Sequence, residues 1–362
     1  MYFGVDYYPE HWPEERWEKD AGMMKEANIN VVRLAEFAWA KIEPDEGVYD
    51  FSWLDRAIAV LALAGIKTVL GIPTAAAPKW LMDKHPDMYP VDMHGLVKGF
   101  GTRRHYCANH SMYREYTRKI TAKMVEHYKD NPNIVAWQTD NEFGDNCYCD
   151  NCRDTFRTWL KKKHGTVEIL NNEWGTVFWS QTYRSFDEVP VPGYSSSDGF
   201  SQTASGSALS TPYNHNPGLL LDYRRFCSDS YVAYQDIQIG EIRKRSRLPI
   251  THNYMGHYNE LDYFKLGENL DFISWDNYPN NMWGRSDYKT TAMAHDLMRG
   301  IKNSNFWVME QQSGPCGWHS MGDTPEPGQI RLWTYQAIAH GADAIVYFRW
   351  RACTFGIEQY WY

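Results

Sequence analysis

Two glutamates, Glu142 and Glu310, each stand at the end of an apolar run that a folded protein would bury. The first closes VAWQTDNE and the second closes FWVME. A buried strand-end carboxylate loses hydration unless charged or hydrogen-bonding partners replace it, and backbone amides or an arginine could satisfy one such acid. Two of them facing one another could instead divide the work of glycoside cleavage. One would donate a proton to the leaving oxygen, and the other would attack the anomeric carbon.

Eight short apolar runs could carry these acids as strands, and longer amphipathic segments separate them. The runs are Tyr2–Tyr8, Asn30–Ala35, Lys67–Pro73, Asn133–Glu142, Pro249–Tyr254, Phe272–Tyr278, Phe306–Gln312 and Ala344–Trp350. Helices are predicted around residues 13–28, 51–65, 111–131, 221–246 and 328–342. This alternation is typical of a parallel sheet covered by helices, and eight such units favour an α/β fold of the (β/α)8 TIM barrel type.

An open doubly wound sheet is the competing architecture. It would need a glycine-rich phosphate loop after the first strand, and YYPEHWP stands there instead. A barrel also gathers the ends of its strands at one mouth, where the acids Glu10, Glu36, Asp140, Asp276 and Glu358 would join the two glutamates.

We expect one catalytic barrel over residues 1–362, with a long loop insertion at 189–218 that is rich in Gly, Ser and Pro. No outer helix is predicted after the eighth strand. We therefore expect either that the sequence is a fragment or that something else covers that face of the barrel.

Composition excludes several classes of protein. The formal net charge of −8 argues against a nucleic-acid partner, and no apolar stretch is long enough to span a membrane. The start, MYFGVDYYPEHW, lacks the pattern of a secretory signal, so we expect a cytoplasmic protein. The high aromatic content suits sugar-binding surfaces and a core of bulky side chains about equally.

Four of the seven cysteines form a candidate metal site. Three of them, Cys147, Cys149 and Cys152, have the spacing C-x-C-x-x-C. The fourth, Cys107, lies on the preceding connection between a strand and a helix. Four thiolates suit a closed, structural zinc site, so Zn²⁺ is the expected metal. The alternative is a set of free buried cysteines. Cys227, Cys316 and Cys353 show no such spacing, and we expect them to be structural.

Several motifs carry a resemblance to a known family. WQTDNEFG resembles the Asn-Glu motif at strand four of retaining glycosidase barrels. YFGVDYYPEHW, RLAEFAWAKIEPDEGVYDFSWLD and VMEQQSGP are similar to glycoside hydrolase family 42, the β-galactosidases, and the resemblance extends to Tyr362. It implies a retaining glycosidase that removes terminal β-D-galactosyl residues through a covalent intermediate. Glu142 would be the acid/base and Glu310 the nucleophile.

The resemblance also implies roles for further residues. Arg103 matches an arginine that contacts the sugar, although Arg104 beside it could take that place. The other implied substrate-binding residues are Tyr278 beside the nucleophile, Trp318 as an aromatic platform and Glu358 as a partner of galactose hydroxyls. Trp361 stands where the family often has histidine, so that contact is in question or is replaced by stacking.

Two contacts follow from the residues themselves. Asn141 could hydrogen-bond the sugar 2-hydroxyl, a contact that strengthens at the transition state. Arg33 could keep Glu310 ionised, or it could form an ordinary buried pair with Glu36.

The resemblance supports the zinc and no organic cofactor, and it implies later domains absent from this chain and a trimer. The partners would be β-galactoside oligosaccharides.

Other functions stay open at this point. A metal hydrolase would want an H-x-H or H-E-x-x-H pattern, which the sequence lacks. A sugar-binding barrel would keep Asn141 and Trp318 but would not need both glutamates. A catalytically incompetent fragment is a further alternative. Within the enzyme class, α-L-arabinopyranosides, β-fucosides and β-glucosides are related substrates.

Overall fold

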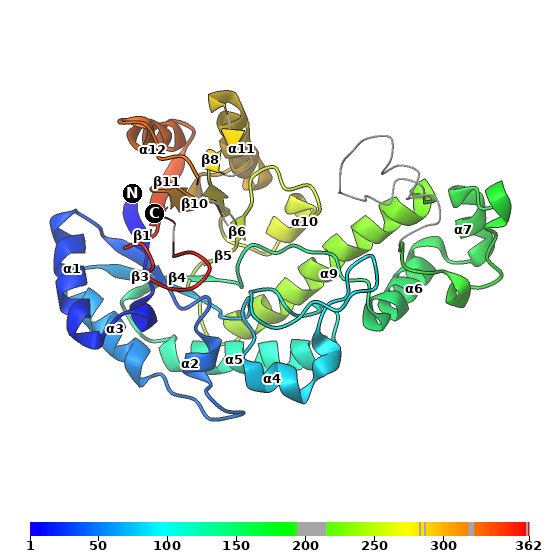
Figure 1. The fold of residues 1–362 in the computed structure, drawn as a ribbon, viewed down its shortest axis with the longest axis horizontal. Coiled ribbons are helices and arrows are strands. Elements are labelled where there is room, and N and C mark those ends of the chain that lie inside the picture. The colour runs from blue at the N-terminus through cyan, green and yellow to red at the C-terminus, as the bar shows by residue number, and fades with distance from the viewer. Residues whose placement is uncertain (194–214, 282–283, 286, 318–321, 360, 362) are drawn as a thin grey trace.

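The computed structural model describes residues 1–362 except 194–214, 282–283, 286, 318–321, 360 and 362. Its centre is a parallel sheet with the order β5-β4-β3-β2-β1-β11-β10-β7-β6. The first and last members are the two halves of one strand, interrupted only at His252, so the sheet returns on itself as a barrel (Figure 1). The strands are β1 Tyr2–Asp6, β2 Val31–Leu34, β3 Lys67–Gly71, β4 Ile134–Gln138, β5 Ile250–Thr251, β6 Asn253–Tyr254, β7 Ser274–Asn277, β10 Phe306–Gln312 and β11 Ala342–Phe348.

All eight predicted strand positions and the TIM-barrel class are confirmed. Helices on the outside of the barrel connect successive strands: α1 Trp17–Glu26, α3 Ser52–Leu63, α5 Ser111–Tyr128, α9 Pro217–Arg243, α10 Tyr263–Gly267, α11 Tyr288–Lys302 and α12 Gln329–Ala339. Two short helices, α2 Trp39–Ile42 and α4 Lys79–Lys84, and a small hairpin, β8 Asn280–Asn281 with β9 Gly284–Arg285, lie in the loops. In the described part of the chain, no helix follows β11 and none is long and apolar enough to cross a membrane.

Inside the barrel, a layer of apolar side chains lies next to a buried charged side chain. Five strands contribute one residue each to a small buried cluster: Val31, Val69, Ala136, Met309 and Val346. Side chains alternate along a strand, so Arg33 lies on the same face of β2 as Val31. Arg33 is fully buried, and the sheet therefore presents a cation directly beside its apolar layer.

A helical lobe outside the barrel was not anticipated. The helices α6 Asp150–His164 and α7 Val167–Trp174 pack beside the start of α9, away from the strands (Figure 1). Phe156 and Leu160, one helical turn apart, are buried in a second core that also contains the four clustered cysteines. The rest of α6 is strongly polar, which hides its narrow apolar stripe in the sequence.

The predicted loop at 189–218 is only partly described. Residues 194–214 of it lie outside the described residues, and α9 begins at Pro217. Asn216 caps this helix by accepting the backbone N–H groups of Gly218 and Leu219.

Candidate active site

Glu142 sits on an irregular segment that follows β4. Both Asp140 and Glu142 have a left-handed backbone with φ of 44°, which costs about 1–2 kcal/mol for a residue with a side chain. One residue of β6 and one of the loop after β3 hold this conformation. Asn253 Oδ1 accepts the Glu142 backbone N–H at 3.2 Å, and Arg104 Nη1 donates to the Glu142 carbonyl at 2.8 Å. The segment is thus fixed in a strained shape that turns Glu142 into the barrel mouth.

His252, at the break between β5 and β6, bridges both ends of the same segment. Its Nε2 accepts the backbone N–H of Phe143 at 3.1 Å, so the ring proton is on Nδ1. Nδ1 lies 2.8 Å from the Thr139 carbonyl and donates to it. Burial lowers the pKa of His252 to about 3, and the neutral tautomer that makes both bonds is therefore the stable one.

Asp140 stabilises the same segment through hydrogen bonds of its carboxylate and its backbone N–H. Its carboxylate accepts hydrogen bonds from Thr74 Oγ1 at 2.5 Å and from the Tyr106 hydroxyl at 3.1 Å. Its backbone N–H donates to Gln238 Oε1 at 3.1 Å. Burial raises the pKa of Asp140 to about 6, although these donors oppose the shift. The residue serves as a buried support for the segment that carries Glu142.

Glu310 comes from β10 and faces two strong donors. Arg33 Nη2 lies 2.6 Å from its Oε1, and the Tyr278 hydroxyl donates to its Oε2 at 2.6 Å. Arg33 also contacts Asp6 at 2.8 Å and Glu36 at 3.1 Å. Both contacts considered for Arg33 from the sequence are therefore present, and its single charge is shared among three carboxylates.

The two glutamates and Asp276 form one cluster of acids. An oxygen of each lies within 4.8 Å of the others. Carboxyl groups stand roughly 5–5.5 Å apart in retaining glycosidases and roughly 6.5–9.5 Å apart in inverting ones, and an oxygen contact this short fits the retaining spacing better. Burial raises the pKa of Glu310 to about 7; Arg33 opposes this shift and Glu142 adds to it. The pair therefore retains one proton near neutral pH.

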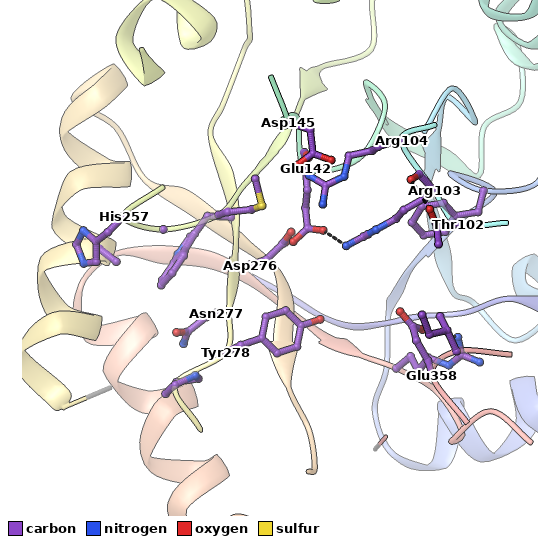
Figure 2. Close-up of a pocket in the computed structure, with 18 of the residues that line it drawn as sticks. Thr102, Arg103, Arg104, Glu142, Asp145, His257, Asp276, Asn277, Tyr278 and Glu358 are labelled. Carbon is purple, nitrogen blue, oxygen red and sulfur yellow. Dashed lines mark hydrogen bonds and ion pairs between the residues drawn. The ribbon is translucent and has the colours of Figure 1, made fainter. Parts of the chain in front are cut away.

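Arg103 contacts the other member of the pair. Its Nη2 lies 2.6 Å from Glu142 Oε2 (Figure 2). Burial alone would raise the pKa of Glu142, but Arg103 and Arg104 outweigh it and hold the pKa below its usual value. Both candidate arginines thus point to Glu142, Arg103 to its carboxylate and Arg104 to its backbone.

A cavity of about 790 Å³ lies beside the two acids, and Arg103, Glu142, Tyr278 and Glu358 are among the residues that line it. Asn141 bridges the two halves of the site, since its Oδ1 accepts from Arg33 and from Asn253 while its Nδ2 donates to Glu142. Glu358 lines the cavity on the side of Arg103, with Arg349 Nη1 3.4 Å away (Figure 2). Trp318 lies outside the described residues, and Trp361 is buried at 3% exposure.

Sequence reasoning missed three residues that shape this site. Asn253 contacts Asn141, Asp276 and Glu310, His252 bridges the Glu142 segment, and Arg349 lies beside Glu358. The available signal for His252 and Asn253 was the run THNY, where polar side chains follow one another in a segment predicted to be a buried strand. A buried strand tolerates such residues only when they find partners.

The four predicted metal-binding cysteines meet behind the Glu142 segment. Cys107, Cys147, Cys149 and Cys152 each place a sulfur within 4.8 Å of the others, and all four are buried. The Cys107–Cys152 and Cys107–Cys149 sulfurs are 3.5 and 3.6 Å apart. Tetrahedral zinc with Zn–S bonds of about 2.3 Å would set its sulfurs roughly 3.8 Å apart, so the donor set fits this ion.

Comparison with known proteins gives a consistent match. The model of glycosyl hydrolase family 42, described as Beta-galactosidase, matches residues 6–362. A Beta-galactosidase of Thermus thermophilus is 45% identical over 98% of this chain and 56% of its own length. The chain spans about half the length of the curated relatives it matches.

Solved structures agree with the sequence match. The beta-galactosidase structure from Halorubrum lacusprofundi has a TM-score of 0.90 at 43% identity, over 99% of this chain and 54% of that one. The one from Bacillus circulans has a TM-score of 0.91 at 41% identity, over 100% and 52%.

Proposed function

Because the chain belongs to glycoside hydrolase family 42, we propose that it hydrolyses terminal β-D-galactosyl residues with retention of configuration. The observation that carries the proposal is that a carboxylate oxygen of Glu142 lies within 4.8 Å of one of Glu310, while Arg103 contacts the first carboxylate and Arg33 the second. That separation suits direct attack by one carboxylate, because retaining glycosidases hold their two carboxyls closer together than inverting glycosidases do.

In the first step, protonated Glu142 gives its proton to the glycosidic oxygen. The Glu310 carboxylate attacks the anomeric carbon, the bond to the leaving group breaks, and the aglycone departs as a neutral alcohol. Arg33 and the Tyr278 hydroxyl, both 2.6 Å from Glu310, hold this carboxylate in position and favour its charged form beforehand. Asn141 lies between the two acids, where it can bind the sugar 2-hydroxyl.

In the second step, the Glu142 carboxylate takes a proton from water. The resulting hydroxide equivalent attacks the anomeric carbon, and Glu310 leaves as a carboxylate. Glu142 ends the cycle protonated, so proton and charge balance over the two steps. Two inversions at one carbon give net retention.

Sugar binding has to move a proton before the first step. Arg103 favours the charged form of Glu142, whereas burial favours the protonated form of Glu310. A sugar hydroxyl that draws the Arg103 guanidinium away would raise the pKa of Glu142. The shared proton would then pass to Glu142 and leave Glu310 charged for attack.

A panel of aryl glycosides, with the product anomer followed by NMR, tests the activity and its stereochemistry. The expected result is fastest turnover of the β-D-galactoside and first formation of β-galactose. Faster turnover of the α-L-arabinopyranoside, β-fucoside or β-glucoside would show that the preferred sugar is not β-D-galactose. Formation of α-galactose as the first product would contradict the retaining mechanism. Glu310→Gln should abolish turnover while the fold is kept, and Glu115→Gln, an exposed acid on α5, is the matched control.

We further propose that Cys107, Cys147, Cys149 and Cys152 hold a structural zinc ion. Four buried thiols at this spacing leave no open coordination position, so the ion would brace the segment between Glu142 and α6. It supplies no chemistry to the reaction in this proposal.

A cytoplasmic location and a homotrimeric assembly complete the proposal. All seven cysteines, each within the described part of the chain, are unpaired, which fits a reducing compartment. Cell fractionation and light scattering on the purified protein test these two points.

A further inference from the structure

Asp276 is a buried acid in the cavity that the two-glutamate mechanism does not use. It stands on β7 in register with Glu310 on β10, and it is 6% exposed. Its Oδ2 accepts a hydrogen bond from Asn253 Nδ2 at 2.6 Å. Its Oδ1 is buried and has no hydrogen-bond partner among the described residues. Asp276 lines the cavity beside Glu142, so its carboxyl group stands at the reacting end of the site (Figure 2).

The charges around Asp276 are mostly negative. Glu142 faces it from the segment after β4, Glu310 from β10 and Asp6 from β1, and Arg33 on β2 is the cation that acts on it. Arg33 is already paired with Asp6, Glu36 and Glu310, and no described residue forms an ion pair with Asp276. Burial, reinforced by the charges of Glu310 and Glu142, raises the pKa of Asp276 well above its usual value.

We propose that Asp276 is a third acid of the active site, which stays protonated during turnover and donates a hydrogen bond to a substrate oxygen beside the anomeric carbon. The inference rests on the proposed glycosidase function and adds a catalytic residue to it. A neutral carboxylic acid offers an acceptor to Asn253 and a donor to the sugar at the same time. It does so without adding a further negative charge beside the attacking carboxylate.

The amide of asparagine has the same two capabilities, which makes Asp276→Asn the decisive variant. Its carbonyl can accept from Asn253, and its NH₂ group can donate where the acid donated. We expect kcat/KM within about fivefold of wild type and both limbs of the pH profile within roughly 0.3 unit, because no charge is removed. Asp276→Ala should lower kcat/KM by roughly 20-fold or more, since it removes the donor and leaves Asn253 without this acceptor.

Two outcomes would overturn the proposal. If Asp276 worked as an anion that stabilises positive charge on the sugar, Asp276→Asn would be as poor as Asp276→Ala. If it were ionised at the optimum, its replacement would shift the pH limbs by a unit or more toward acid, because Glu142 and Glu310 would lose a neighbouring negative charge.

An infrared measurement separates this proposal from the proposed function, because it needs no turnover. At pH 8.5 we expect a carbonyl band of a protonated carboxylic acid that Asp276→Asn removes. Asp236→Asn, the same change at an exposed position on α9, should keep the band. If wild type failed to turn over galactosides but the band behaved as expected, the glycosidase proposal and the contact of Asp276 with that substrate would fall, while the neutral state of Asp276 would stand. If Asp276→Asn, with its thermal midpoint unchanged, removed no such band, Asp276 would not be a neutral acid.

Discussion

Arg103 Nη2 lies 2.6 Å from Glu142 Oε2, so the arginine predicted to bind sugar is an ion-pair partner of the predicted proton donor. A proton donor must carry its proton, and a nearby guanidinium works against that. The same contact therefore couples substrate binding to protonation. The consequences can be measured in the pH dependence of kcat/KM, which reports the enzyme before sugar binds.

Removing this arginine should change both rate and pH profile. In wild type, kcat/KM should fall as pH rises through about 7, because the Glu142–Glu310 pair then loses its shared proton. Arg103→Ala removes a cation that favours the charged pair, so this alkaline limb should move to higher pH while kcat/KM drops by roughly 100-fold. Arg103→Lys keeps the charge and should retain the wild-type limb. An unmoved limb in Arg103→Ala would show that the ion pair does not set the titration.

Azide should reveal which glutamate does which job. Glu142→Ala leaves Glu310 able to form the covalent intermediate, and azide can then attack it in the place of water. We expect azide to raise turnover of an activated aryl galactoside and to give β-galactosyl azide, because two inversions have occurred. In Glu310→Ala, azide can only attack the substrate directly and should give the α-azide. The opposite pattern of products would exchange the two roles.

The proposed zinc site can be tested by comparing a substitution inside the cysteine cluster with one at a nearby cysteine outside it. Cys149→Ser removes one of the four clustered thiols, whereas Cys227→Ser changes a buried cysteine of the same core that lies outside the cluster. Metal analysis of protein purified without chelator should find one zinc per chain in wild type and Cys227→Ser, and a loss in Cys149→Ser. Thermal stability should fall with the metal, since a closed site contributes to folding. Wild-type protein that contains no zinc would contradict the prediction, and the cluster would then be four free thiols.

A buried histidine should make stability depend on pH. His295 is fully buried, neither ring nitrogen has a described partner, and burial lowers its pKa to about 3. The unfolded chain binds a proton near pH 6.5, so stability is lost as pH falls below 6.5 toward 3. Between pH 7 and pH 5 this amounts to about 2 kcal/mol. Urea unfolding of His295→Leu should show a pH difference smaller by that amount, and an equal difference in both proteins would contradict the prediction.

The sequence was sufficient for the barrel because its strands are buried on both faces and appear as short apolar runs. It also placed Glu142 and Glu310 at one mouth, since strand ends of a barrel converge. It could not give the partner of Arg103, because Arg103 and Arg104 are neighbours and only the folded chain determines which one reaches a carboxylate. The helices α6 and α7 were missed for a different reason. Their apolar residues pack on the start of α9, far along the chain, and the rest of α6 is rich in lysine, arginine and aspartate.

The hydrogen bonds that His252 makes with Thr139 and Phe143 bear on which parts of the chain can change in sequence without moving Glu142. Glu142 is tied to the adjoining strand on both sides of its own position, and the chain leaves for the helical lobe only afterwards. Insertions, deletions or a different metal content in residues 144–193 can therefore alter the outer rim of the site. The spacing between the two reacting carboxyls would be inherited unchanged.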